Sequence, residues 1–239
     1  MNQTLTIAQR EWLSLFYSPI AYVVSGLFGL GTAMILLLYF GPGQPAHLRE
    51  TFEGLIWLMI FLVPAISMRL FSEEWRQGTI ELLMTSPIRE THIVIGKWLG
   101  AMGFLAVLLI PIMILTAILY ATAHPDPGPL VTGLLGLLLV GGLYLAIGTF
   151  ASACTQNQII AFLLTTFVVC VLTIVLFFLP QAAFVPDQYR GFLYYLNVNK
   201  QFDNFNKGLI DYTNIIYFLS LIAFFLFLAV QTIQSKRWR

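Results

Sequence analysis

Six apolar runs, each near the roughly 20 residues that a helix needs to cross a hydrocarbon core, divide this chain of 239 residues. Charged residues make up only 10% of the chain and hydrophobic residues 59%, whereas a soluble domain has about 25% charged residues. The sequence therefore predicts an all-α integral membrane protein, built as a single transmembrane domain over residues 1–239. The predicted spans are Ile20–Phe40, Leu55–Phe71, Trp98–Ala123, Leu130–Ala153, Ile159–Leu179 and Ile215–Ile233.

Lysine and arginine residues predict the orientation, because they are more frequent in loops on the cytoplasmic side. An even number of spans places both termini on one side, and eight of these cations lie there against four on the other side. Those on the terminal side are Arg10, Arg69, Arg76, Arg89, Lys97, Lys236, Arg237 and Arg239; those on the other side are Arg49, Arg190, Lys200 and Lys207. We expect a multi-pass protein of the bacterial cytoplasmic (inner) membrane with both termini in the cytoplasm and no removable signal peptide.

The segment before the first span has the pattern of an amphipathic helix. Its apolar residues recur at helical spacing: Leu5, Ala8, Trp12, Leu15 and Phe16. Ser18-Pro19 then breaks the helix. We expect it to lie in the cytoplasmic membrane interface, with Trp12 as an anchor. A polar tail without this role is the alternative.

The connection between spans two and three, Ser72–Trp98, is long and charged. Ser72 can cap a helix whose first turn holds Glu73 and Glu74, where carboxylates meet the positive end of the helix dipole. Thr85-Ser86-Pro87 would end this helix and begin a second short one, which would carry Arg89, Glu90 and His92. Two such helices would form a compact projection suited to docking into a partner. The alternative is a solvated loop.

On the other side of the membrane, Pro180–Asn214 predicts two short helices that lie on, or dip into, the outer leaflet. Their apolar residues fall at helical spacing: Tyr189, Phe192, Leu193 and Leu196, then Phe202, Phe205 and Leu209. Gly208 stands where the second helix would end. For the aromatic residues, membrane anchoring is favoured over substrate contact.

Catalytic motifs are missing from the sequence. Neither H-E-x-x-H nor G-x-S-x-G occurs, and Gly96-Lys97 is followed by Trp98, so the chain has no phosphate-binding G-x-x-x-x-G-K-[ST] loop. The predicted spans hold almost no ionisable residue that could couple transport to an ion gradient. We therefore expect no enzyme activity in this chain, and energy from a separate ATPase.

Other functional classes are excluded on similar grounds. The net charge of +1 is spread along the chain, which gives no footprint for nucleic acid. Cys154 and Cys170 form no disulfide or zinc pattern. The histidines His47, His92 and His124 are expected in loops, as surface residues. We expect neither a cofactor nor a metal bound by this chain.

The stretch SEEWRQGTIELLMTSPIRETHIVIGKWLG, Ser72–Gly100, closely resembles the cytoplasmic loop of ABC-2 family transporter permeases. The segment QFDNFNKGLIDYTNIIYFLSLIAFFLFL, Gln201–Leu228, is similar to the gliding-motility-associated branch of that family. The resemblance implies that two copies of the chain pair as a homodimer, and that two ATPase subunits, which bind ATP and Mg, dock beneath them. It also implies an auxiliary subunit with a large extracytoplasmic domain, besides the membrane lipids as neighbours.

In that family each ATPase grips a coupling helix, which the resemblance places at about Glu73–Thr85 of this chain. The residues implied as its polar contacts are Glu73, Glu74, Arg76 and Glu81, and those implied as its apolar seat are Leu82, Leu83 and Met84.

Two functions remain open. The chain can be a permease that forms the substrate path and works by alternating access, or a subunit that relays ATPase strokes to an extracytoplasmic partner without transport. An intramembrane enzyme is a distant third hypothesis. Glycines would let the helices pack closely and slide, although ordinary packing explains them equally well. These glycines are Gly26, Gly29, Gly133, Gly136, Gly141 and Gly142.

Overall fold

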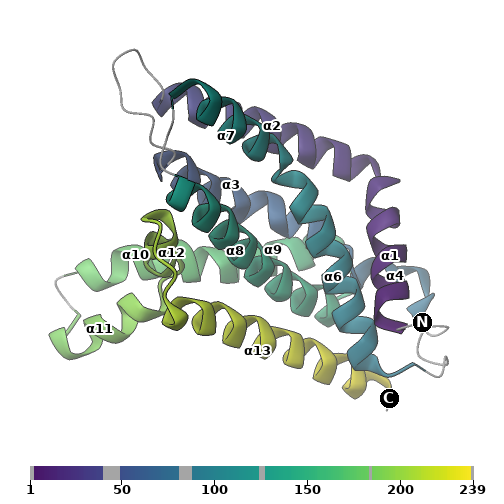
Figure 1. Cartoon of the computed structure of the whole chain (residues 1–239). Helices are drawn as coiled ribbons and strands as arrows, with labels where there is room; N and C mark the ends of the chain where they lie inside the picture. Colours follow the sequence, from purple (N-terminus) through teal and green to yellow (C-terminus); the bar gives the residue numbers. More distant parts are fainter. Residues whose placement is uncertain (1–2, 40–48, 81–87, 124–126, 183–184, 238–239) are drawn as a thin grey trace.

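The computed structural model describes residues 3–39, 49–80, 88–123, 127–182 and 185–237 (Figure 1). These residues are almost entirely helical, and none of them forms a strand. The helices are α1 (Gln3–Phe16), α2 (Pro19–Tyr39), α3 (Arg49–Ser67), α4 (Ser72–Gln77), α6 (Glu90–Leu108), α7 (Ile110–Ala123), α8 (Pro127–Cys154), α9 (Gln158–Cys170), the π-helical turn η1 (Val171–Val175), α10 (Leu176–Phe178), the 3-10 turn η2 (Leu179–Gln181), α11 (Asp187–Leu196), α12 (Val198–Asn206) and α13 (Tyr212–Arg237).

Among the described residues, six helical stretches are long and apolar enough to cross a membrane, as the sequence predicts. They are Pro19–Tyr39, Arg49–Gln77, Glu90–Ile118, Gly128–Cys154, Gln158–Gln181 and Tyr212–Lys236. Several begin earlier than predicted, because hydropathy marks only the apolar middle of a helix. Backbone hydrogen bonding continues through the polar residues beyond it.

The third stretch corrects two expectations. Arg89, Glu90 and His92 do not belong to a separate short helix, because α6 begins at Glu90 and runs without a break into the membrane span. His92 therefore lies on a helix and is half-buried, rather than in a loop. His47 and His124 lie outside the described residues.

Helix α8 forms the centre of the bundle. In its most apolar stretch 67% of the residues are buried, against 22% in α2 and 28% in the fifth span. Large side chains of neighbouring helices fit against its glycines: Phe52 meets Gly133, Phe202 meets Gly136, and Leu105 meets Gly141. The expected close packing is therefore present on α8.

Helix α2 does not follow that expectation. Among the described residues, a Cβ atom at Gly26 or Gly29 would find no atom within 4 Å apart from its own helix backbone and chain neighbours. The reason is the peripheral position of α2, which turns these two glycines away from the other helices of the chain. They do not mediate helix contacts within one copy.

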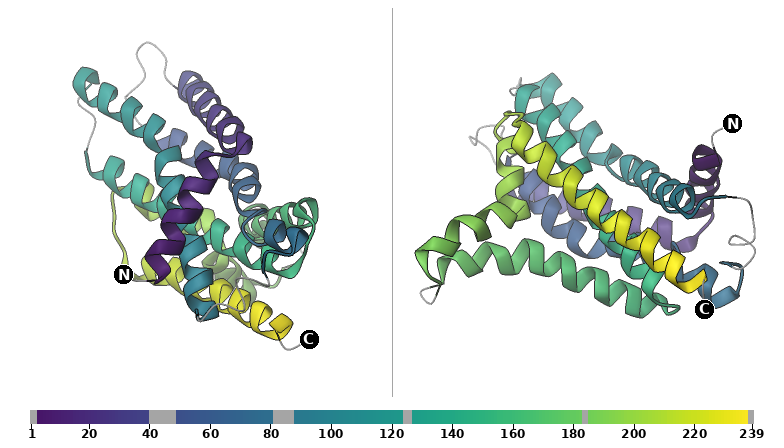
Figure 2. Two further views of the ribbon diagram at one scale, coloured as in Figure 1. Left: turned by 90° about the vertical axis from the view of Figure 1, so that its right-hand side faces the viewer. Right: turned by 90° about the horizontal axis from the view of Figure 1, so that it is seen from below.

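Both termini lie at the same end of the bundle, which we call the terminal end (Figures 1 and 2). Helices α1 and α4 are also there, whereas α11 and α12 lie at the other end, which we call the opposite end. The two short helices predicted after span five are confirmed as α11 and α12. Gly208 ends the second of them with a positive φ of 84°, as a helix C-terminus favours.

The N-terminal helix is confirmed, and part of its apolar stripe is buried: Leu15 is 2% exposed, and Ala8 and Phe16 are half-buried. Helix α1 packs along α6, where Gly96, Gly100 and Gly103 make room for it. A Cβ at Gly100 would stand 2.8 Å from the backbone oxygen of Ala8. Leu5 remains 61% exposed and Trp12 38%, so the rest of the stripe is left uncovered by the described residues.

Candidate functional site

Helix α4 lies at the start of the segment, about residues 73–85, where the resemblance predicts a coupling helix, but it is short. It covers Ser72–Gln77 and ends at Gly78, whose φ of 72° is left-handed. Phe71, not Ser72, occupies the cap position, and no side chain caps the helix. Ser72 instead donates a hydrogen bond back to the carbonyl of Met68. The expected helix over about 73–85 therefore ends at Gln77.

Three of the predicted contact residues lie on α4. Arg76 is exposed, and Glu73 and Glu74 are partly buried. The remaining four lie outside the described residues: Glu81, Leu82, Leu83 and Met84.

Ser152 of α8 holds the turn that leads into α4. Its hydroxyl accepts hydrogen bonds from the backbone N–H groups of Phe71 (2.9 Å) and Ser72 (3.0 Å). It donates to the carbonyl of Met68 at 3.0 Å. Ser152 is fully buried, so one side chain satisfies backbone groups that would otherwise be costly to bury. Sequence reasoning missed this residue because a serine inside an apolar run carries no motif.

Lys97 joins α4 to two other helices. Its Nζ lies 2.9 Å from Oε1 of Glu74 on α4 and 3.0 Å from Oε2 of Glu11 on α1. It also lies 5.2 Å from the centre of the Phe71 ring, a cation–π distance. Lys97 is only 2% exposed. We call Lys97, Glu11 and Glu74 the Lys97 cluster.

The Lys97 cluster is energetically demanding. Burying a charge costs several kcal/mol, which close partners must offset, and removing one partner costs about 3–5 kcal/mol. Here two carboxylates face one ammonium, and Oε2 of Glu74 has no hydrogen bond of its own in the part of the chain that the structure describes. The geometry therefore favours an arrangement in which α1, α4 and α6 move together.

Further contacts at the terminal end join α1 to α6, and α13 to α8 and α4. The Thr4 hydroxyl on α1 lies 2.9 Å from Nδ1 of His92 on α6. Lys236, near the end of α13, donates to the carbonyl of Ala153 at 2.9 Å and lies 4.4 Å from the centre of the Trp75 ring on α4. Helix α4 thus touches elements from both ends of the sequence.

A polar cleft of about 440 Å³ opens between α1 and α4. Charged residues of both signs line it, and they are Arg10, Glu11, Arg69, Glu73, Glu74 and Lys97. Within the described ranges, no group of three or more His, Cys, Asp or Glu residues is arranged to hold a metal ion. The mixed charges of the cleft suit charge-complementary docking.

Comparison with known families identifies the class of protein. A family model described as ABC-2 type transporter matches residues 2–202, which is most of the chain. The chain belongs to this family. This ABC-2 protein is accordingly the membrane component of an ABC transporter, the part that does not carry the ATPase. No curated protein matches it.

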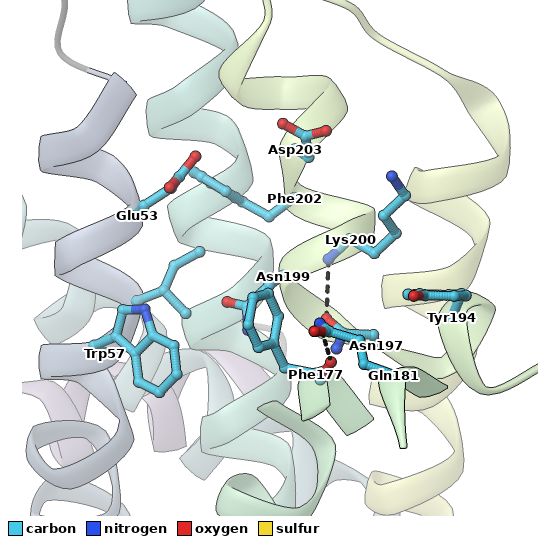
Figure 3. A pocket seen from close by; sticks show the side chains of 11 residues that line it. Glu53, Trp57, Phe177, Gln181, Tyr194, Asn197, Asn199, Lys200, Phe202 and Asp203 are labelled. Carbon is cyan, nitrogen blue, oxygen red and sulfur yellow. Dashed lines mark hydrogen bonds between the residues drawn. The ribbon is translucent and has the colours of Figure 1, made fainter. Parts of the chain in front are cut away.

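The matched region of this ABC-2 protein includes the whole Lys97 cluster and α4. It also includes all the lining residues except Asp203 of a pocket of about 290 Å³ at the opposite end, between α3, the end of span five and the α11–α12 pair (Figure 3). Its walls combine aromatic, amide and charged side chains, among them Trp57, Phe177, Asn199 and Lys200.

Ion pairs hold α12 beside this pocket. Asp203 accepts a hydrogen bond of 2.7 Å from Arg49 of α3 and also pairs with Lys207. Burial acts to raise the pKa of Asp203, but the hydrogen bonds from Lys207 and Arg49 outweigh it and leave that pKa below its ordinary value. Asn206 adds a hydrogen bond of 3.0 Å to Glu53.

Proposed function

We propose that this chain is the transmembrane permease subunit of a bacterial ABC transporter, coupled to a separate ATPase through its 72–97 segment. The family supports the role of permease. The observation that carries the coupling is the Lys97 cluster, because it ties α4 to α1 and α6 through a buried charge. Both termini, and with them α4, would then face the cytoplasm, as the distribution of Lys and Arg favours.

Force on α4 would reach the bundle through the contacts that its own residues, Ser72 and Glu74, make with other helices. A helix of six residues is too short to be stable alone, so tertiary contacts set its position. The Lys97 cluster links it to α1 and α6, and the Ser152 hydrogen bonds link its first turn to α8. Displacing α4 must either move these helices or expose a buried ion.

The residues of α4 would have two separate roles: some contact the ATPase, and Glu74 contacts Lys97 within the chain. Glu73 and Arg76 line or flank the open side and are suited to contact the ATPase. One oxygen of Glu74 lies 2.9 Å from Nζ of Lys97, and its second oxygen is buried without a hydrogen-bond partner among the described residues. Glu81, Leu82, Leu83 and Met84 remain predicted contacts.

The wider assembly in this proposal has two permease copies and two ATPase subunits, which bind ATP and Mg. We place the chain in the gliding-motility-associated branch on the resemblance of residues 201–228. This stretch lies almost entirely beyond the region that the family model matches. An auxiliary subunit with an extracytoplasmic domain belongs to the same proposal.

A second candidate function is the relay of ATPase strokes to an extracytoplasmic partner without transport. The observation that favours it is α11, which projects from the opposite end of the bundle and has no buried residue (Figure 2). Tyr189 and Phe192 on this helix are 56% and 64% exposed. Such a helix would suit a partner that receives the motion.

The test is to co-express the chain with the ATPase encoded beside it and to measure how much ATPase is retained on the purified permease. Reversing the charges of Glu73 and Arg76 together, as Glu73→Lys with Arg76→Glu, should lower retention about tenfold or more. Glu50→Lys, an exposed charge reversal at the opposite end, is the matched control and should retain the ATPase normally. Unchanged retention in the double variant would refute docking through α4.

A further inference from the structure

The opposite-end pocket has the two-sided chemistry of a site for an amphiphile. Its lining has an apolar part, Ile56, Trp57, Phe177 and Phe202, which we call the floor, and two exposed charged residues, Glu53 and Lys200, which we call the rim. Figure 3 shows Glu53 and Trp57 on the α3 side and Lys200 on the α12 side. At about 290 Å³ the pocket is at the small end for ligand sites, which fits a headgroup better than a whole drug-sized molecule.

Lys200 and Glu53 each have a charged group on the rim that can still pair with a ligand. Within the described part of the chain, the Lys200 ammonium has no carboxylate at ion-pairing distance. Glu53 uses only one oxygen, which accepts from Asn206 at 3.0 Å and lies 3.8 Å from Nε of Arg49. Its side chain is 54% exposed. The rim therefore offers one cation and one carboxylate oxygen to a ligand.

Asp203 is not available in the same way. One of its oxygens accepts from Arg49 and the other from Lys207. The charge that a ligand meets is thus set by Lys200 on one side and Glu53 on the other. A ligand with both an anionic and a cationic hydrogen-bonding group would satisfy both.

Asn199 fixes the wall of the pocket to span five. Its side-chain amide donates to the carbonyl of Thr173 at 3.1 Å. Thr173 lies in the π-helical turn η1, and its hydroxyl is 2.7 Å from the hydroxyl of Tyr144 on α8. π-Helical turns inside α-helices often mark functional sites. The pocket is therefore held in shape before any ligand binds, which lowers the entropic cost of binding.

We propose that this pocket binds the headgroup of a membrane phospholipid that carries both a phosphate and a primary ammonium group, as phosphatidylethanolamine does. The phosphate pairs with Lys200 and the ammonium donates to Glu53. The glycerol and the first acyl carbons lie against Trp57 and Phe177. Trp57, an aromatic residue with a polar N–H group, favours this depth in a membrane.

This proposal goes beyond the proposed function, because the site exists whether the chain transports a substrate or relays force. It also distinguishes between headgroups. Choline has no N–H to donate to Glu53, and phosphatidylglycerol has no ammonium at all. Free phosphoethanolamine has the same charged groups but lacks the chains that contact the aromatic floor.

The test uses the purified full-length chain alone in detergent micelles, with binding measured by native mass spectrometry. The probes are phosphatidylethanolamine, phosphatidylcholine and phosphatidylglycerol with identical acyl chains, and soluble phosphoethanolamine. We expect phosphatidylethanolamine to bind about tenfold more tightly than each of the others, which corresponds to about 1.4 kcal/mol. Equal binding of the lipids, or tightest binding of phosphatidylglycerol, would overturn the proposal. So would soluble phosphoethanolamine binding as tightly as the lipid.

Two variants separate the contacts. Glu53→Gln should remove the preference for phosphatidylethanolamine over phosphatidylcholine, and Lys200→Gln should weaken both lipids together. Asp187→Asn and Arg190→Gln, which change charges on α11 outside the pocket lining, are the matched controls and should bind as the unchanged chain does. An equal loss in variants and controls would contradict the assignment of the site.

Discussion

The two ends of the bundle each hold a cluster of opposite charges, but the clusters differ in burial. At the terminal end, the Lys97 side chain is 3% exposed and its partners Glu11 and Glu74 are 14% and 18% exposed. At the opposite end, Arg49 is 44% exposed and Asp203 24%. A buried ion cannot lose a partner cheaply, whereas an exposed pair is worth about 0–1 kcal/mol. The terminal cluster can therefore hold helices together, while the opposite one only tethers α12.

Replacing Lys97 should give the largest effect. Lys97→Met leaves Glu11 and Glu74 facing each other without a cation, and we expect a loss of about 3–5 kcal/mol in the free energy of unfolding. Urea unfolding followed by tryptophan fluorescence in detergent measures it. Lys97→Arg keeps the charge and should lose less. If Lys97→Met were no less stable than Arg49→Met, the buried charges at the terminal end would not stabilise the fold more than the exposed charges at the opposite end.

The second-largest effect is expected from removing the Ser152 hydrogen bonds that hold the turn before α4. Ser152→Ala leaves the backbone N–H groups of Phe71 and Ser72 buried without an acceptor, at a cost of about 1–3 kcal/mol. Faster hydrogen exchange at residues 71–77 would report the loosened turn. Ser235→Ala, at an exposed serine near the end of α13, is the control and should leave that exchange unchanged. Equal exchange in both variants would mean that Ser152 does not hold α4.

The α1–α6 contact can be tested with one added methyl group. Gly100→Ala would place Cβ 2.8 Å from the backbone oxygen of Ala8 and from Cβ of Glu11. We expect a destabilisation of about 1–3 kcal/mol from overpacking. Gly26→Ala meets no atom within 4 Å and should be neutral within about 0.5 kcal/mol. Thermal unfolding compares the two, and equal melting temperatures would argue against close packing of α1.

The smallest effect belongs to Asp203 and depends on pH. Its lowered pKa means that the ion pairs stabilise the fold above the unfolded value of about 3.9, and that this contribution is lost as pH falls through the lower folded value. The melting temperatures of the unchanged chain and Asp203→Asn should therefore differ at pH 7 and converge toward pH 3. Asp187→Asn, at a side chain 91% exposed, should show little difference at either pH. A difference in melting temperature that grows as the pH falls would contradict the lowered pKa of Asp203.

The spans and short helices could be predicted because apolar runs and helical spacing reflect local chemistry. The Lys97 cluster could not. Lys97 reads as a loop cation in the sequence, since the apolar run begins at Trp98, but the helix extends eight residues further back, to Glu90. Its partner Glu11 is 86 positions away, and no local pattern reports such a pairing.

Helix α4, the proposed coupling helix, shows the same limit in another form. Its acidic first turn and its position after span two follow from the sequence. Its early end is set by the left-handed backbone of Gly78. Its placement depends on Ser152, a single hydroxyl 80 residues from Ser72 in the chain. Long-range hydrogen bonds of this kind can only be seen in the fold.

The most direct test of the central claim is ATP hydrolysis by the purified complex of this chain with its ATPase. If α4 drives the bundle through Lys97, the Glu74→Gln complex should assemble normally but hydrolyse ATP at about a tenth of the rate of the unchanged complex, or less, which corresponds to a loss of about 1.4 kcal/mol or more. Glu50→Gln, an exposed change at the opposite end, should hydrolyse it at the full rate. Equal rates for Glu74→Gln and the unchanged complex would contradict the account.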